Sequence, residues 1–378
     1  MTPTSLLLLG GGLAFLFLGA EWLVRGSARL ALLLGIPPLV VGLTVVAVGT
    51  SAPEAMVTLG AALDGRSQLA LGNVLGSNVF NILFILGVAA LMAPIAVGSR
   101  LLRLDVPAMV LLSVLVYLLA LNGSIGPWEG GLLLALGVGY TWFRVWLARS
   151  RRIERPRPTV SRERAIRPPK PTGGVWLNLA FTVAGLILLA VGARWLVDGA
   201  VDVGRALGMS ELVIGLTLVA GGTSLPEVAA SIMAAARGER DIAVGNVVGS
   251  NLYNLTLVLG LGGLASPGGI PVATGVLGFD IPFMIIVAVA CLPIFFTGAR
   301  IDRWEGALFL AYYGAYLGCL FLKAVDHEVL PLYSGIMWLF VIPLTAITLG
   351  VIMVRELRAR RRNGESGPGT PLDRPGSA

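Results

Sequence analysis

Long apolar blocks, separated by short polar breaks, follow one another along almost the whole chain. Because a helix needs about 20 mainly apolar residues to cross a bilayer, each block predicts one membrane-spanning helix. The pattern therefore predicts an all-α polytopic membrane protein. The eleven expected spans are 4–24, 37–62, 68–93, 104–121, 128–148, 175–197, 211–236, 241–265, 278–297, 304–323 and 332–354.

Composition agrees with this prediction and excludes other classes. Of the 378 residues, 56% are hydrophobic and only 13% are charged, whereas soluble domains carry about 25% charged residues. A water-soluble enzyme is therefore excluded, and with neither an HExxH motif nor a nucleophile–base pair we expect no enzyme. Cys291, Cys319 and His327 stand apart, so neither a disulfide framework nor a zinc site is predicted, and we expect no cofactor.

The distribution of Lys and Arg predicts the orientation of the chain, because short cytoplasmic loops carry an excess of these residues. With the N-terminus outside, 23 of the 28 Lys and Arg fall on the cytoplasmic side and four fall outside. We therefore expect a multi-pass protein of the cytoplasmic (inner) membrane with a cytoplasmic C-terminus. The formal charge of +7 is then a topology signal, and no nucleic-acid partner is expected.

An internal repeat divides the chain into two halves. Residues 42–87 align without a gap on residues 215–260, with 23 identities in 46 positions. Each half holds five spans, and since five is odd the halves have opposite orientations, which is typical of secondary transporters. The prediction is two inverted five-helix repeats plus an eleventh helix. The expected divisions are a first repeat (1–148), an Arg/Pro-rich cytoplasmic linker (149–173), a second repeat (174–324), the additional helix (325–358) and a disordered cytoplasmic tail (359–378).

Two glutamates are exceptional because they lie near the middle of predicted spans. Glu54 and Glu227 occupy equivalent repeat positions, and an acidic side chain at the centre of a membrane helix costs about 2.5–3.5 kcal/mol. Each must be paired, protonated or bound to a cation, so a protonated, hydrogen-bonded pair is the alternative to a cation site. Other acidic residues begin helices and are expected to cap them. These are Asp105, Asp280, Glu129 and Glu305.

The neighbours of the two glutamates supply further oxygen atoms. The segments GTSAPE (49–54) and GGTSLPE (221–227) each contain a proline, which removes an amide and disrupts the preceding turn. We expect the helices to break there and to expose backbone carbonyls, which is tolerated only beside protein or a cavity. In the following spans, GNVLGSNVFN (72–81) and GNVVGSNLYN (245–254) place a serine and an asparagine four residues apart on one helix face. The candidate ligands are Ala47, Thr50, Ser51, Glu54, Ser77, Asn81, Ala220, Thr223, Ser224, Glu227, Ser250 and Asn254.

All of these candidates offer oxygen, which hard cations prefer. Ca²⁺ takes six to eight oxygen ligands, and Na⁺ follows the same preference. Two carboxylates neutralise one Ca²⁺, which lowers the cost of placing it in the membrane. Gly72 and Gly76 have a separate explanation, since small residues also favour close packing of membrane helices.

At these motifs the chain resembles the cation/calcium exchanger superfamily and looks most like its prokaryotic sodium/calcium exchanger branch. The two motif pairs match the alpha-repeats of that family, and the resemblance covers ten spans in two inverted halves. It implies that the candidate residues bind the transported ions and that the first and sixth spans slide over the rest. Some relatives carry Asp where this chain has Asn81 or Asn254, so potassium coupling is not expected.

The resemblance implies a secondary-active antiporter that exchanges Na⁺ for Ca²⁺ by alternating access at the membrane midplane. Two alternatives stay open: a calcium/proton antiporter, in which both glutamates trade protons for calcium, and a passive cation channel. The expected partners are Ca²⁺, Na⁺ and membrane lipid, and no obligate protein partner is expected.

Overall fold

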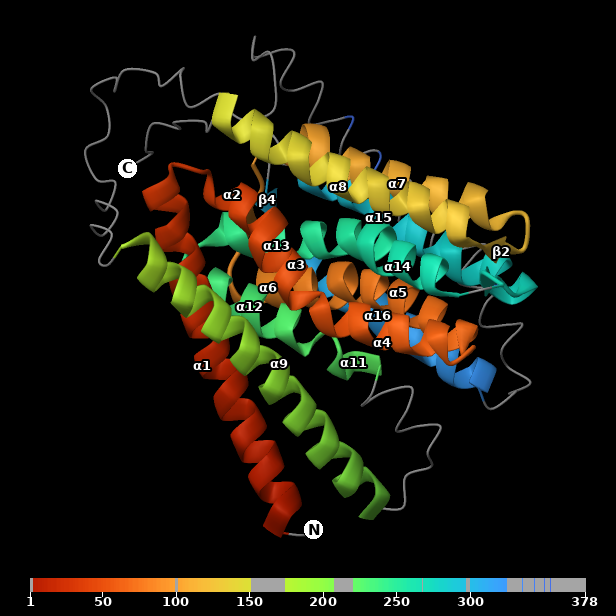
Figure 1. Ribbon diagram of the computed structural model, residues 1–378, viewed down its shortest axis with the longest axis horizontal. Coiled ribbons are helices and arrows are strands. Elements are labelled where there is room, and N and C mark those ends of the chain that lie inside the picture. The colour runs from red at the N-terminus through yellow and green to blue at the C-terminus, as the bar shows by residue number, and fades with distance from the viewer. Residues whose placement is uncertain are drawn as a thin grey trace.

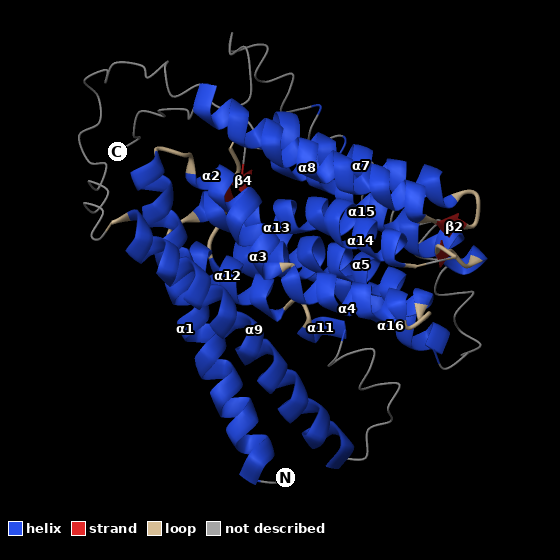
Figure 2. Ribbon diagram, viewed as in Figure 1, coloured by secondary structure: helices blue, strands red, loops and turns tan. Residues whose placement is uncertain are grey.

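The described part of the chain folds into a helical bundle that also contains four strands of two residues each (Figures 1 and 2). The computed structural model describes residues 3–98, 101–150, 174–206, 220–266, 268–296 and 300–324, together with 335, 343, 350 and 354. Eight described helices are long and apolar enough to cross a membrane, and a further candidate is a helix pair bent by 43°. The predicted helical membrane protein is therefore confirmed.

Several predicted segments lie outside the described residues. They are most of the linker, from residue 151 onward, the first part of the seventh span, nearly all of the eleventh span and the tail. The boundaries proposed for those segments stay predictions.

The first half begins with a long apolar helix and then alternates short and long elements. These are α1 (Pro3–Leu34), α2 (Pro38–Val41), η1 (Gly42–Val46), α3 (Ala47–Thr50), α4 (Ala52–Leu63), α5 (Ser67–Phe80), η2 (Asn81–Leu86), α6 (Gly87–Met92), β1 (Ile95–Ala96), η3 (Leu101–Asp105), α7 (Val106–Ala120), β2 (Ser124–Ile125) and α8 (Pro127–Ser150), where η marks a π-helical turn.

The second half follows a similar order. Its elements are α9 (Val175–Ala206), α11 (Ala220–Gly222), α12 (Leu225–Ala236), α13 (Arg240–Tyr253), η6 (Asn254–Val258), α14 (Leu259–Ala265), β3 (Ile270–Pro271), η7 (Val276–Asp280), α15 (Ile281–Phe296), β4 (Arg300–Ile301) and α16 (Arg303–Ala324).

The helices α1 and α9 lie side by side as a tilted pair whose one end extends beyond the other helices (Figure 1). They are antiparallel, because the contacts of Gly12 fall at Leu196 and those of Gly19 fall at Gly185. A methyl group on Gly12 would lie 2.7 Å from the backbone of Leu196. Glycine is therefore needed for this close approach, as in other packed membrane helices.

The spans that carry the serine and asparagine motifs run through the centre of the bundle. In the apolar stretch of Arg240–Ala265, 94% of the residues are buried, and in that of Leu69–Met92 the share is 72%. The corresponding share in the other long candidate spans is 22–39%. The polar motifs are thus held inside protein, where their hydrogen-bonding groups avoid contact with lipid.

Contacts between the halves recur at equivalent positions. Strand β1 pairs with β4, and β2 pairs with β3, both antiparallel, so each small sheet joins the two halves. Likewise Gly130 packs on the backbone of Gly260, and Gly306 packs on that of Gly87. These paired contacts hold each motif-bearing span against a helix of the opposite half.

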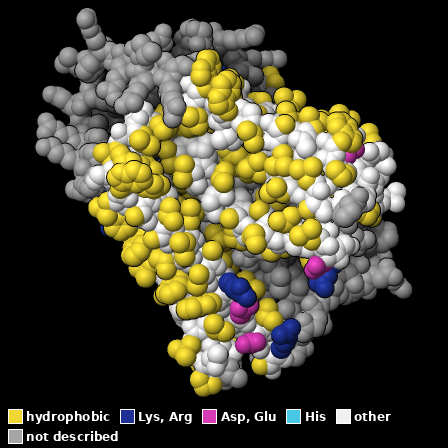
Figure 3. Space-filling model, viewed as in Figure 1, with side chains coloured by type: hydrophobic (Ala, Val, Ile, Leu, Met, Phe, Trp, Pro, Cys, Tyr) yellow, Lys and Arg dark blue, Asp and Glu magenta, His cyan; other side chains and the backbone are white. Residues whose placement is uncertain are grey.

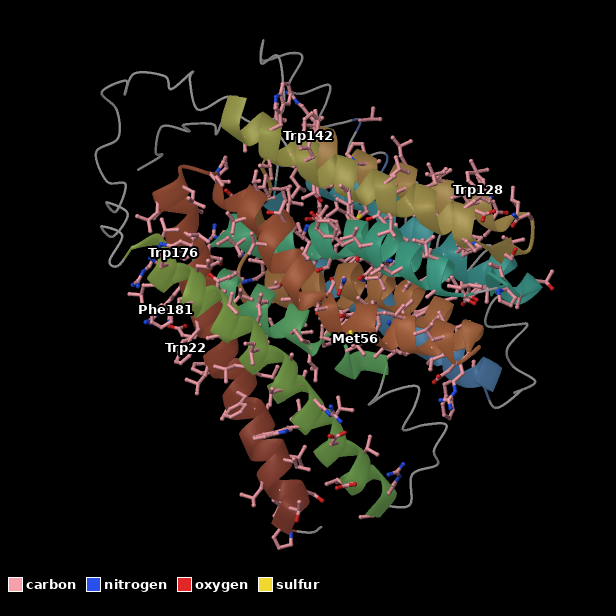
Figure 4. The ribbon with its side chains drawn as sticks, in the orientation of Figure 1. Trp22, Met56, Trp128, Trp142, Trp176 and Phe181 are labelled. Atoms are coloured by element: carbon pink, nitrogen blue, oxygen red, sulfur yellow. The ribbon has the colours of Figure 1, made fainter. Side chains whose placement is uncertain are left out.

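The outer surface is largely apolar. Hydrophobic side chains cover much of the face in Figure 3, and charged side chains gather around the free end of the α1–α9 pair. Trp128, Trp142 and Trp176 are exposed by 66%, 68% and 82% and lie on the outside of the bundle (Figure 4). An apolar exterior with tryptophans is typical of a protein that faces lipid.

Candidate ion-binding site

Two broken helices meet at the centre of the molecule. In the first half α3 ends at Thr50 and α4 begins at Ala52, and in the second half α11 ends at Gly222 and α12 begins at Leu225. Ser51 and Ser224, at the breaks, have almost the same backbone conformation, with φ −80° and −89° and ψ 6° and 7°. The prolines that follow lack the amide that would continue the preceding turn. The predicted breaks are therefore present.

Each break holds the glutamate of the other half. Ser51 Oγ donates to Glu227 Oε1 at 3.0 Å. In the equivalent contact, Ser224 Oγ donates to Glu54 Oε1 at 2.9 Å. Both glutamate side chains are fully buried. The two halves thus build one acidic centre.

The serines and asparagines of the next spans surround this centre. Ser77 Oγ lies 3.2 Å from Ser224 Oγ, and Ser250, at the equivalent position of the second half, is fully buried. Asn81 and Asn254 are fully buried and begin the π-helical turns η2 and η6. Such turns occur frequently at functional sites, because the widened turn redirects side chains and backbone groups.

Several buried oxygens at this centre have no hydrogen-bond partner among the described residues. They are Glu54 Oε2, Glu227 Oε2, Asn81 Oδ1, Ser250 Oγ and Asn254 Oδ1. Buried polar groups are satisfied in the great majority of cases, so a group of orphaned oxygens is unusual. Two are carboxylate oxygens, two are amide oxygens and one is a hydroxyl oxygen, and all can bind a hard cation. The arrangement can therefore accept a cation without first giving up a protein hydrogen bond.

Not every predicted ligand has a free oxygen. The carbonyl of Ala47 already accepts the amide of Ser51 at 3.0 Å, and Ala220 begins α11 at the edge of the described region. Thr50 Oγ1 donates to Asn246 Oδ1 at 3.1 Å, and Thr223 Oγ1 donates to Asn73 Oδ1 at 3.4 Å. One lone pair remains on the carbonyl oxygen of Ala47 beside the amide of Ser51, and both lone pairs remain on each threonine hydroxyl, which donates its proton.

Asn73 and Asn246 contact the site although the candidate set does not contain them. Both stand at the same repeat position, inside the motifs quoted above, and Asn73 precedes Ser77 by four residues. Residues four apart share a helix face, so Asn73, Ser77 and Asn81 form one row. This four-residue spacing is the sequence feature that could have identified Asn73 and Asn246, because it extends the row of serine and asparagine by one helical turn.

Expectations about residues outside the centre were met only in part. Glu129 Oε2 accepts the amide of Gly126 at 2.9 Å and Glu305 Oε2 accepts that of Asp302 at 2.7 Å, so both cap helices as expected. Asp105 was wrongly predicted to do so.

The Asp105 side chain makes no capping bond and instead contacts two residues of α8. It pairs with Arg144 at 3.2 Å and accepts a hydrogen bond from Tyr140 at 2.7 Å. Because Arg144 offers a full charge, the ion pair prevails over a cap.

The glycines of the second half pack closely against the first half. Added methyl groups on Gly245 and Gly249 would lie 2.9 and 2.8 Å from the carbonyl oxygens of Leu39 and Leu43. The packing explanation therefore holds for these two. For Gly72 and Gly76 the equivalent partner segment falls within 207–219, outside the described residues.

Comparison with known families gives an extensive match. The family described as sodium/calcium exchanger protein matches the chain in two stretches, residues 4–146 and 177–322. Together these stretches contain both broken helices and both motif-bearing spans.

Individual relatives cover most of the chain. The sodium/calcium exchanger MaX1 of Methanosarcina acetivorans is 33% identical, over 85% of this chain and 99% of that protein. The inner membrane protein YrbG of Escherichia coli is 41% identical, over 71% of this chain and 81% of that protein. Among solved structures, the sodium-calcium exchanger NCX_Mj soaked with Na⁺ and Sr²⁺ superposes with a TM-score of 0.72 at 30% identity, covering 84% of this chain and 99% of that one.

Proposed function

The chain belongs to the sodium/calcium exchanger family, and from this premise we propose that it is a secondary-active antiporter that exchanges Na⁺ for Ca²⁺. It is a multi-pass membrane protein. We place it in the cytoplasmic membrane with its N-terminus outside and its C-terminus inside, in accord with the distribution of Lys and Arg.

The reciprocal contact between the halves is the observation that carries this proposal. Ser51 holds Glu227 and Ser224 holds Glu54, so two carboxylates from opposite halves face one buried centre. No Lys or Arg of the described residues forms an ion pair with either glutamate. The centre therefore carries a charge of −2 when both carboxylates are ionised, and a cation is needed to balance it.

That charge suits both transported ions. One Ca²⁺ or two Na⁺ neutralise the two carboxylates, so the two kinds of ion compete for the same oxygens. The ligands of the proposed site are the carboxylates of Glu54 and Glu227 with the hydroxyl, amide and carbonyl oxygens of the remaining candidate residues, at the interface between the halves. This placement matches the midplane sites of transporters with inverted repeats.

Alternating access requires parts that move against each other. The α1–α9 pair is long, close-packed within itself and set at a tilt beside the remaining helices (Figure 1). We propose that this pair slides as one body over the others and exposes the centre first to one side of the membrane and then to the other. Competition between ions, combined with this motion, gives obligate exchange.

The test uses the full chain reconstituted in liposomes. Vesicles loaded with Na⁺ and diluted into Na⁺-free buffer that contains radioactive Ca²⁺ should accumulate Ca²⁺, and equal Na⁺ on both sides should abolish the uptake. Uptake driven by a pH gradient with Na⁺ absent would instead establish a calcium/proton antiporter. Flux that needs no counter-ion would establish a channel.

A further inference from the structure

Asn246 joins three separate elements through its single amide group. Its Oδ1 accepts the proton of Thr50 Oγ1 at 3.1 Å, across the boundary between the halves. Its Nδ2 donates to Ser231 Oγ at 2.9 Å and to the backbone carbonyl of Glu227 at 3.4 Å. Asn246 therefore ties the break of the first half to the helix that carries the second glutamate.

The same arrangement occurs around Asn73 in the first half. Asn73 Oδ1 accepts from Thr223 Oγ1 at 3.4 Å, and Asn73 Nδ2 donates to Thr58 Oγ1 at 2.9 Å and to the carbonyl of Glu54 at 3.1 Å. Three hydrogen bonds of each asparagine thus have counterparts in the other half. Accidental packing does not explain such correspondence between residues 173 positions apart.

The direction of these bonds determines what the threonine oxygens can do. A hydroxyl has one proton and two lone pairs. When Thr50 gives its proton to Asn246, only lone pairs remain on Oγ1 for other contacts. The carbonyl of Ala47 is also an acceptor within reach of this proton, but at 3.4 Å it lies further away than Asn246 Oδ1. Asn246 thereby fixes Thr50 Oγ1 as an electron-pair donor, which is the state that can bind a cation.

We propose that Asn73 and Asn246 are positioning residues that tune the affinity of the site for Ca²⁺ without binding the ion themselves. Each acts through the threonine of the opposite half and through the backbone of the glutamate in its own half. This inference rests on the proposed function, because it assigns the second layer of that same site.

A double-mutant cycle tests the coupling between Asn246 and Thr50. Asn246→Leu keeps the side-chain size and removes every hydrogen bond, and Thr50→Val removes only the hydroxyl. We expect each variant to raise the dissociation constant for Ca²⁺ about tenfold, as measured by calorimetry on purified protein. Both substitutions remove the same hydrogen bond between Thr50 and Asn246. The double variant should therefore bind Ca²⁺ no more than about tenfold more weakly than wild type.

The two-fold arrangement supplies a matched control. Thr223 is bonded to Asn73 and not to Asn246, so Asn246→Leu combined with Thr223→Val should multiply the two losses to about a hundredfold. Asn78→Leu is a second control, because Asn78 is buried on the same helix as Asn73 but donates only to Val74 of that helix. This variant should retain near-normal Ca²⁺ affinity and equal the others in amount of folded protein.

The possible results separate this inference from the proposed function. The positioning role would be overturned if the losses of Ca²⁺ affinity multiplied when Asn246→Leu is combined with Thr50→Val, just as they do with Thr223→Val. Unchanged Ca²⁺ affinity in Asn246→Leu would also overturn it. If the variants show the expected coupling in Ca²⁺ binding but wild-type protein transports Ca²⁺ without Na⁺, the proposed exchange would be overturned and the positioning role would stay intact. Wild-type protein that binds no Ca²⁺ would overturn both.

Discussion

Ser51 of one half and Glu227 of the other lie 3.0 Å apart, and their repeat partners Ser224 and Glu54 lie 2.9 Å apart. Each glutamate is therefore held by a break that belongs to the opposite half. Any sliding of one half against the other must act on both carboxylates at once. This relationship makes the paired glutamates the first target for mutation.

We expect Glu54→Gln and Glu227→Gln each to abolish Na⁺-dependent Ca²⁺ uptake. Either change halves the charge available to balance a divalent ion and leaves the side-chain volume almost unchanged, so the protein should still insert and fold. The measurement is Ca²⁺ uptake into liposomes, normalised to the amount of reconstituted protein. Glu239→Gln, in the turn before α13, is the control for loss of one carboxylate. Near-normal exchange by both glutamine variants would show that the pair is structural.

The two break serines should differ in importance. Ser224 Oγ contacts both Glu54 and Ser77, whereas Ser51 Oγ contacts Glu227 alone among the described side chains. A hydrogen bond to a charged group contributes about 1.5–3 kcal/mol, so each alanine variant should weaken Ca²⁺ binding by roughly 10- to 150-fold. We expect the loss in Ser224→Ala to be the larger, measured by calorimetry. A larger loss in Ser51→Ala would contradict this reading of the contacts.

The buried pair of Asp105 and Arg144 should matter for stability. Removing one partner of a buried ion pair costs about 3–5 kcal/mol, because the other charge stays buried. Arg144→Leu should therefore lower the unfolding temperature in detergent, and Asp105→Asn added to it should restore much of the loss. Leucine suits this position, since Leu320 is the equivalent residue of the second half in the register that pairs Gly130 with Gly306. If the double variant is no more stable than Arg144→Leu, the pair is not the cause.

Much of this architecture was accessible from the sequence. The bilayer fixes the length of an apolar span, and proline forces a break in a helix, so the spans and the breaks at Ser51 and Ser224 follow from local pattern. The repeat then identified Glu54 and Glu227 as equivalent residues. All of these features are determined by residues that lie near one another in the sequence.

Other features depend on packing and were not predictable in the same way. The bond from Ser51 to Glu227 joins residues 176 positions apart, and the pairing of Asp105 with Arg144 overrides a local capping preference. Asn73 and Asn246 were visible as identical residues in the repeat, but their role depends on which partner their amides reach. Hydrogen-bond direction between distant residues is set by the assembled bundle.

A second ion pair links the α1–α9 pair to the rest of the molecule. Glu21 of α1 pairs with Arg237, the residue that follows α12, and also with Arg25 of its own helix. At the equivalent repeat positions stand Arg194 in α9 and Asp64 at the end of α4, with both charges reversed. In each half, therefore, the two equivalent positions carry charges of opposite sign that could attract each other across the interface. In this structure Arg194 pairs instead with Asp198, at 3.9 Å, and its side chain is 84% exposed.

Because alternating access exchanges the roles of the halves, we expect Arg194 and Asp64 to meet in the opposite state, when Glu21 and Arg237 separate. Cysteine pairs at 21/237 and at 194/64, in a chain with Cys291 and Cys319 replaced, can be oxidised and the disulfides quantified by mass spectrometry. Ionic conditions that raise disulfide formation in one pair should lower it in the other. The exchanged-charge variant Glu21→Arg/Arg237→Glu should transport better than either single change. If the two disulfides form together under all conditions, or the 194/64 disulfide never forms, the α1–α9 pair does not move as proposed.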